Sequence, residues 1–231
     1  MSRQIMASVA RGDSPCCEFR VCADQPIRDR GLADYVVPLQ GSLLVRDGEG
    51  KVEDTVGRLR AHLVLADRAQ NEGAPLAGIF NRHGHELSQL SRALYDRRTA
   101  EFKPCVQAVF QNEICRPNLL FVEQIEVLAE YRRQRLGLVA VGRMIDLFSG
   151  GCGLVALKNE PLRPTASEDP DESRWLDRMR YNLFDSDKPL ARIRLTHHWA
   201  RLGFLPLSGT PYVALAPELR RPTLEEVLQD A

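Results

Sequence analysis

Two carboxylates and two imidazoles stand where they can move protons. Glu123 and Glu126 lie near the end of the apolar run LLFVEQIEVL, and His197 and His198 lie in the later segment LTHHWARLGF. A carboxylate or an imidazole placed beside an amine accepts its proton, and an imidazole can also return one to a leaving group. These four residues are therefore the candidates for general acid and base chemistry.

A basic turn follows the apolar run. Residues 130–137 are EYRRQRLG, and the apolar stretch LVAVGRMIDLF comes next. The first amides of a helix lack intrahelical partners and lie at the positive end of its dipole, so phosphate binds there through backbone N–H groups. Arg132, Arg133 and Arg135 add positive charge at the same point. This strand-to-helix junction is predicted to bind an anion.

The segments that must position these groups alternate between strand and helix patterns. Residues 35–65 predict a hairpin, because two β-rich runs flank DGEGK, whose glycines permit the φ angles of a turn. The other predicted elements are helices over 87–95 and 100–110 (interrupted by Pro104), a strand over 119–128, a helix from 137, a strand over 151–161, helices in 173–185 and 188–204, and a strand over 210–217. This order predicts an α/β sheet with helices on both faces.

Periodicity assigns faces to the candidate residues. Side chains alternate along a strand, so Glu123 and Glu126 are expected on opposite faces, and Glu123 shares the parity of Val127. Glu123 is therefore the preferred base and Glu126 the alternative, although either can instead pair with an arginine. In the helix over 188–204, the apolar stripe predicted to face the core consists of Leu190, Ile193, His197 or Trp199, and Leu202.

Length and composition suit a single globular domain. The chain has 231 residues, of which 44% are hydrophobic and 27% charged. We expect a flexible N-terminal segment over 1–33 with one strand at the apolar patch EFRVCA, one domain over 34–215, and a C-terminal tail over 216–231. The 31 basic residues balance 31 acidic ones, so no overall charge recruits nucleic acid or an anionic membrane.

The cysteines and the N-terminus indicate a reducing cytoplasm. The N-terminal residues lack the apolar core of a secretory signal, and no window reaches the roughly 20 apolar residues that span a bilayer. The six cysteines show no metal-ligand spacing, and Cys152 is expected as a buried apolar residue. His83 and His85 precede a helix in a turn, and no metal is expected.

Two motifs resemble the GNAT superfamily of N-acetyltransferases. The order Val127, Glu130, Tyr131, Arg132, Arg135, Leu136, Gly137 resembles its acetyl-CoA-binding motif, Arg/Gln-x-x-Gly-x-Gly/Ala. The phrase WARLGF, followed by a strand, resembles the second signature, an aromatic residue or Tyr, three residues, then Gly-Phe. The resemblance covers about a third of the chain, residues 119–160 and 190–215, and is to a bacterial-type member. It implies the acyl-CoA N-acyltransferase fold, a mixed central β-sheet flanked by helices on both faces.

The resemblance also implies a co-substrate and its contacts. In the family, acetyl-CoA donates an acetyl group to a primary amine by direct attack in a ternary complex. The strand end, here Val127 and Leu128, pairs with the pantetheine arm and contacts the thioester carbonyl. Amides of the following loop bind the pyrophosphate, which here assigns Arg132, Arg133, Gln134, Arg135, Leu136, Gly137 and Leu138.

Two positions depart from the family pattern. Arg135 stands where the first motif glycine is common, and its side chain must either point outward or lie along the phosphate. Trp199 stands where the family often has a tyrosine that protonates the leaving thiolate, and an indole N–H is no acid at neutral pH. His197 and His198 are the candidate substitutes.

Two other functions remain open at this point. The first is a catalytically silent module that binds acyl-CoA or a protein partner, which the two departures favour. The second is a nucleic-acid-binding α/β domain that uses the three arginines, which the neutral net charge disfavours. For the acyltransferase the expected partner is a small-molecule or peptide amine, with neither nucleic acid nor membrane, and a homodimer is compatible with the sequence.

Overall fold

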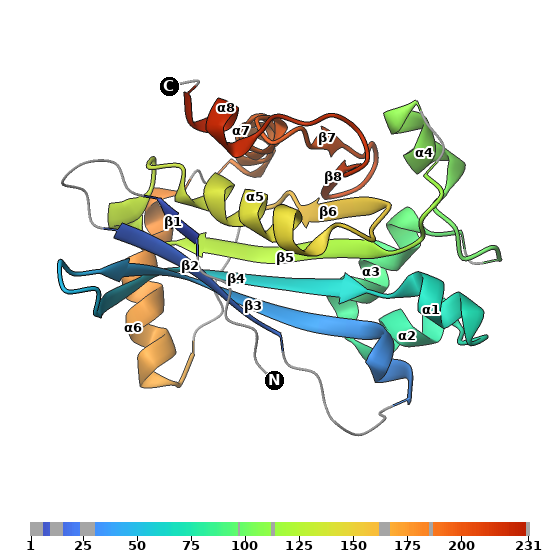
Figure 1. Ribbon diagram of the computed structural model, residues 1–231, viewed down its shortest axis with the longest axis horizontal. Coiled ribbons are helices and arrows are strands. Elements are labelled where there is room, and N and C mark those ends of the chain that lie inside the picture. The colour runs from blue at the N-terminus through green and yellow to red at the C-terminus, as the bar shows by residue number, and fades with distance from the viewer. Residues whose placement is uncertain are drawn as a thin grey trace.

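The computed structural model describes residues 7–9, 16–23, 31–96, 98–111, 114–161, 167–184 and 187–229. In this part of the chain one eight-stranded sheet forms the centre, in the order β1-β2-β3-β4-β5-β6-β8-β7 (Figure 1). The strands are β1 Ala7–Val9, β2 Cys16–Ala23, β3 Val36–Arg46, β4 Val52–Val64, β5 Leu119–Val127, β6 Leu154–Lys158, β7 Leu205–Pro206 and β8 Tyr212–Leu215. Only β5 and β6 run parallel among these neighbours, so the expected α/β class with a mixed sheet is confirmed.

Helices cover both faces of the sheet. One core contains buried residues of α5 (Leu136–Phe148), α7 (Lys188–Ala200) and α8 (Leu224–Gln229). The opposite core contains those of α1 (Ala66–Asn71), α2 (Leu76–Arg82), α3 (His85–Leu94) and α4 (Pro104–Phe110). α6 (Pro170–Met179) contributes to a third, smaller cluster, and the short 3-10 turns are η1 Gly31–Tyr35, η2 Ala129–Tyr131 and η3 Tyr181–Leu183. No helix among the described residues is both long and apolar enough to cross a membrane.

β5 is shared by the two large cores. Leu120 and Val122 belong to the core on the α5 side, whereas Leu119 and Phe121 belong to the opposite core, and all four are at most 1% exposed. Burial on both faces explains the continuous apolar run in the sequence. Each of these side chains contributes about 1.5–3 kcal/mol by its burial, so β5 is firmly held as far as Val122.

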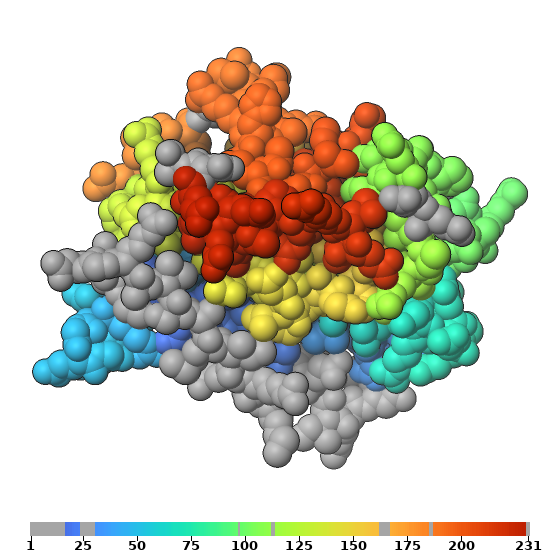
Figure 2. Space-filling view, turned by 45° about the horizontal axis from the view of Figure 1, so that its top comes forward, coloured from blue at the N-terminus to red at the C-terminus, as the bar shows by residue number. Residues whose placement is uncertain are grey.

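Both ends of the chain take part in the packed structure. β2 pairs with β3 along its whole length, and Phe19 and Val21 enter the core on the α5 side, so the strand expected in the N-terminal segment is present, and β1 adds a second strand beside it. At the other end, Val227 of α8 is buried, and the C-terminal residues lie across α5 (Figure 2). Gly142 of α5 leaves the room that Leu224 occupies, because a Cβ there would lie 2.3 Å from Leu224 Cδ2. The described part of the expected tail is therefore packed.

Two local expectations are wrong, the second in part. Pro104 begins α4 instead of interrupting it, because a proline in the first turn lacks only an N–H that has no helical partner. The apolar stripe expected in and just after α7 faces the core only in part: Trp199 and Leu202 are 4% and 0% exposed, whereas Leu190 and Ile193 are 38% and 54% exposed. In the first turns of α7 the buried residue is Ala191, one position after Leu190.

Candidate functional site

A cleft opens where β5 and β6 part. The two strands pair only between Leu119–Val122 and Leu154–Leu157, and beyond these pairs β5 continues along β4 alone. The cavity between the separated ends has a volume of about 660 Å³. Its walls are the end of β5, the loop and first turn of α5, and one face of α7. The predicted strand-to-helix junction is therefore one wall of this cleft.

A β-bulge at Glu123 marks the point of separation. Ala61 of β4 is opposite Val122 and Arg60 is opposite Gln124, so Glu123 is an extra residue without its own partner on β4. A bulge interrupts the alternation of side chains. The expectation that Glu123 and Glu126 lie on opposite faces is therefore wrong, and both carboxyl groups point to the face opposite α5, where Glu123 meets His62 and Glu126 meets Trp175.

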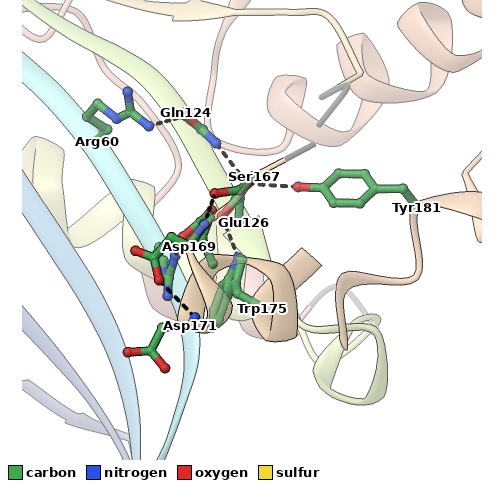
Figure 3. Close-up of polar contacts among 10 residues, drawn as sticks. Arg60, Gln124, Glu126, Ser167, Asp169, Asp171, Trp175 and Tyr181 are labelled. Carbon is green, nitrogen blue, oxygen red and sulfur yellow. Dashed lines mark hydrogen bonds and ion pairs between the residues drawn. The ribbon is translucent and has the colours of Figure 1, made fainter. Parts of the chain in front are cut away.

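Glu126 is a buried anchor (Figure 3). Its side chain is 6% exposed. Oε1 accepts hydrogen bonds from Gln124 Nε2 and from the Tyr181 hydroxyl, both at 2.8 Å, and Oε2 accepts one from Trp175 Nε1 at 2.7 Å. Since a carboxyl group accepts about four such bonds, Glu126 has little capacity left for a substrate proton. Its contacts tie α6 and η3 to β5.

The residues that bind Glu126 are themselves held by neighbouring groups: α6, which carries Trp175, has a capped N-terminus, and two arginines contact Trp175 and Gln124. Asp169 caps α6 by accepting a hydrogen bond of 2.9 Å from the N–H of Asp171 (Figure 3). The Arg58 guanidinium lies 3.9 Å from the centroid of the Trp175 ring. Arg60 Nη2 donates to Gln124 Oε1 at 2.8 Å. No arginine among the described residues forms an ion pair with Glu126 itself.

Glu123 differs from Glu126, because it lies where β5 and β6 separate and its carboxylate has one hydrogen-bond partner among the described residues. Its Oε2 lies 2.8 Å from His62 Nε2, and its side chain is 19% exposed. The hydrogen bond from His62 holds the pKa of Glu123 below its ordinary value, with the charges of His62, Arg60 and Lys158 acting in the same direction and burial opposing them. Lys158, which follows the last residue of β6 that pairs with β5, also lines the cleft and binds Glu86 at 2.7 Å. Glu123 is thus a half-buried carboxylate facing the cavity.

The N-terminus of α5 faces the cleft from the other side. Arg135 is the N-cap, and no side chain caps the first amides, which belong to Leu136, Gly137 and Leu138. Arg133 and Arg135 have φ angles of 65° and 62°, in the left-handed region that favours glycine. A Cβ at Gly137 would have only Val127 Cγ2 nearby, at 3.9 Å, so the protein leaves this side of the helix open. The arrangement suits an anion that approaches the backbone closely.

The three arginines of the loop have separate roles. Arg132 Nε donates to the Val127 carbonyl at 2.9 Å, its Nη2 donates to the Met179 carbonyl, and its guanidinium lies 4.2 Å from the centroid of Phe184. Arg135 points outward, and its Nη1 donates to the Val227 carbonyl of α8 at 2.8 Å. Arg133 is exposed at the rim of the cleft. Of the three, Arg133 is the one whose side chain makes no hydrogen bond to the described residues.

The two histidines of α7 point in different directions, and only one of them faces the cleft. His198 lines the cleft, and burial, with a smaller effect from Arg201, lowers its pKa below the ordinary value. Its ring meets that of Trp199 edge-on, with centroids 4.7 Å apart. His197 is exposed and lies outside the cavity wall, because adjacent helical residues point about 100° apart. Of this pair, only His198 shares a cavity with Glu123.

Some of the site residues expected from the sequence line the cleft, and others do not. Those that line it are Glu123, Glu126, Val127, Arg132, Arg133, Arg135, Leu136, Gly137 and His198. Those outside the lining are Leu128 and Leu138, both fully buried, and the exposed Gln134 and His197. Sequence reasoning missed Arg194 and Arg201, which α7 adds to the wall at i and i+7. It also missed His62, whose signal is a histidine in a strand that is otherwise buried at Ala61 and Val64.

Other reactive groups stand apart from the cleft. Burial raises the pKa of Cys152 to about 12, so its thiol is no nucleophile at neutral pH. The five cysteines whose side chains are described are free thiols. His85 is exposed and contacts Gln89, whereas His83 is half-buried. Within the described ranges no group of three or more His, Cys, Asp or Glu side chains is arranged to hold a metal ion.

Comparisons with protein-family models, with curated proteins and with solved structures found no match to this chain.

Proposed function

We propose that the protein is an acetyl-CoA-dependent N-acyltransferase that transfers an acetyl group to a primary amine by direct attack in a ternary complex. The observation that carries the proposal is that one cleft contains both an uncapped helix N-terminus and a half-buried carboxylate. The uncapped first turn of α5 and Arg133 suit a pyrophosphate, and Glu123 suits an amine proton. The two GNAT-like motifs of the sequence are the second support.

The chain's groups fit acetyl-CoA in a specific way. Beyond Val122, β5 has no strand partner on the β6 side in the described part of the chain, so backbone groups there are available to an extended amide-containing arm. The amides of Leu136 and Gly137, with Arg133, Arg194 and Arg201 around them, suit its phosphates. The left-handed backbone at Arg135 supplies the loop conformation that a glycine supplies in the family motif.

The reaction uses few groups of the protein. The amine nitrogen forms a bond to the thioester carbonyl carbon, the carbon–sulfur bond breaks, and its electron pair leaves on the CoA thiolate. Glu123 accepts the proton that the amine loses. Solvent returns a proton to the thiolate, and His198, which lines the cleft, is the candidate to donate a hydrogen bond to it through a ring N–H.

Calorimetric titration with acetyl-CoA tests the binding step. Gly137→Leu adds a side chain on the open side of α5 and should abolish binding while leaving the fold intact, because no described residue lies closer than 3.9 Å to a new Cβ. Gly48→Leu is the matched control, since a Cβ at this hairpin glycine also meets none of the described residues within 4 Å and Gly48 does not line the cleft. Binding by the wild type and the control alone supports the proposal, and no binding by the wild type contradicts it.

Turnover is tested by the release of CoA thiol with a panel of primary amines: a polyamine, an aminoglycoside, an amino acid and a lysine-containing peptide. Release that depends on amine and is lost in Glu123→Gln supports an acyltransferase. A second candidate, an acyl-CoA-binding module without turnover, is favoured by one observation, the buried Trp199 in place of a tyrosine. Tight acetyl-CoA binding with no amine-dependent release across the panel would select this module.

A further inference from the structure

The cleft carboxylate has a supporting residue on the neighbouring strand. His62 of β4 is directly opposite Phe121 of β5, and the two rings stack with centroids 6.3 Å apart and planes 19° apart. The bulge then brings Glu123, two residues beyond Phe121, within 2.8 Å of His62 Nε2. Glu123 lines the cavity, whereas His62 stands behind it, outside the lining.

The hydrogen-bond pattern of His62 fixes its tautomer. An ionised carboxylate has no hydrogen to give, so the proton of this contact belongs to His62 Nε2. His62 Nδ1 is buried and has no hydrogen-bond partner among the described residues. A proton on Nδ1 would be buried without an acceptor, which costs free energy. Of the two neutral tautomers, the contact geometry therefore favours the one with hydrogen on Nε2.

The surroundings of the pair are mixed in charge. Arg60 and Lys158 act on Glu123 from β4 and β6, and His83 at the end of α2 interacts electrostatically with His62. Lys158 is itself neutralised by Glu86 of α3 at 2.7 Å and Glu160 at 3.9 Å. Tyr212 of β8 lies on the same face, with its ring edge toward Phe121. His62 is the one group in this set that contacts the Glu123 carboxylate directly.

We infer that His62 is a positioning residue for Glu123, holding Oε2 so that Oε1 is presented to the amine in the cleft. Oε1 has no hydrogen-bond partner among the described residues, so it is the oxygen available to take the amine proton. His62 keeps its own Nε2 proton throughout and exchanges none with the substrate. This inference rests on the proposed acyltransferase function.

The substitution series uses the geometry of the ring. A glutamine amide nitrogen reaches about as far as Nε2, whereas an asparagine amide reaches only as far as Nδ1. His62→Asn and His62→Ala should therefore lower kcat for amine-dependent thiol release about 10–100-fold, with the KM for acetyl-CoA unchanged, and His62→Gln should recover most of the rate. The acid limb of the kcat profile should move to higher pH in His62→Ala, because loss of the hydrogen bond raises the pKa of Glu123.

Two measurements separate this inference from the function on which it rests. Long-range ¹⁵N–¹H NMR spectra report the tautomer of each of the five histidines, with His62 assigned from His62→Gln. The Nε2–H tautomer in the wild type, perturbed in Glu123→Gln, is the expected result, and an Nδ1–H ring would overturn the contact. Full activity in folded His62→Ala would overturn the positioning role alone. Absence of turnover by wild-type protein that binds acetyl-CoA would overturn the acyltransferase function and this role together.

Discussion

Glu123 and Glu126 are close on one strand and face the same side of the sheet, yet their surroundings differ. Glu126 is 6% exposed and accepts three hydrogen bonds from neutral donors, two of them on α6 and η3. Glu123 has one partner, His62, and opens on the cavity. The number of donors around a carboxyl group, more than its place on the strand, separates an anchor from a candidate base.

The largest expected effect is the loss of stability on removing the anchor. Glu126→Ala leaves Trp175 Nε1–H buried without an acceptor and releases α6 and η3, so the free energy of unfolding should fall by about 2–4 kcal/mol. Urea denaturation followed by tryptophan fluorescence measures it. Glu123→Ala, which removes one hydrogen bond at a half-buried site, should cost less than about 1 kcal/mol. Equal losses of stability in the two variants would contradict the distinction between Glu126 as an anchor and Glu123 as an open carboxylate.

The next effect concerns catalysis at the open carboxylate. Glu123→Gln keeps the size of the side chain and removes its basicity, so amine-dependent thiol release should fall about 100-fold, equivalent to about 2.7 kcal/mol in the barrier. Affinity for acetyl-CoA, measured by calorimetry, should change little, because the phosphate side of the cleft is untouched. An unchanged rate would remove Glu123 as the base.

A smaller effect is the pH dependence of stability. The pKa of Glu123 is lower in the folded protein than its ordinary value of 4.5, chiefly because of the hydrogen bond from His62. Its contribution to stability is therefore present above pH 4.5 and is lost as the pH falls through the folded-state pKa. Urea unfolding of wild type and Glu123→Gln should give a stability difference that shrinks at acidic pH, and a difference that grows on acidification would contradict the assignment.

The smallest effect separates two arginines of the loop. Arg133→Gly should raise the free energy of unfolding by up to about 1 kcal/mol, because glycine adopts the left-handed conformation without strain. Arg135→Gly should give little or no gain, since it also removes the bond to the Val227 carbonyl. Thermal denaturation compares the two, with Arg133→Ala as a control that retains a Cβ. A larger gain at Arg135 would show that its side-chain contact contributes nothing.

The sequence predicted much of the local structure around the cleft. The hairpin of β3 and β4, the strand β5 and the helix α5 all occur where periodicity and turn residues placed them. Arg135, which the sequence marked as standing where a glycine is common, adopts a backbone conformation in the left-handed region that favours glycine. The errors lie where contacts with a neighbouring strand or helix decide which way a side chain points. Leu190 and Ile193 of α7 are one such case, and the face of the sheet on which Glu126 lies is another.

By itself, the sequence determined the α/β class, the order of these elements and the basic strand-to-helix junction. These follow from interactions between residues close in the chain, such as alternation, helical spacing and turn conformation. Only the tertiary structure decided that a bulge at Glu123 parts β5 from β6, that Glu126 is saturated by Trp175 and Tyr181, and that His62 supports Glu123. The physical reason is that bulges, burial and donor counts depend on register and packing between distant segments: His62 and Glu123 are 61 residues apart in the chain, and Glu126 and Tyr181 are 55 apart.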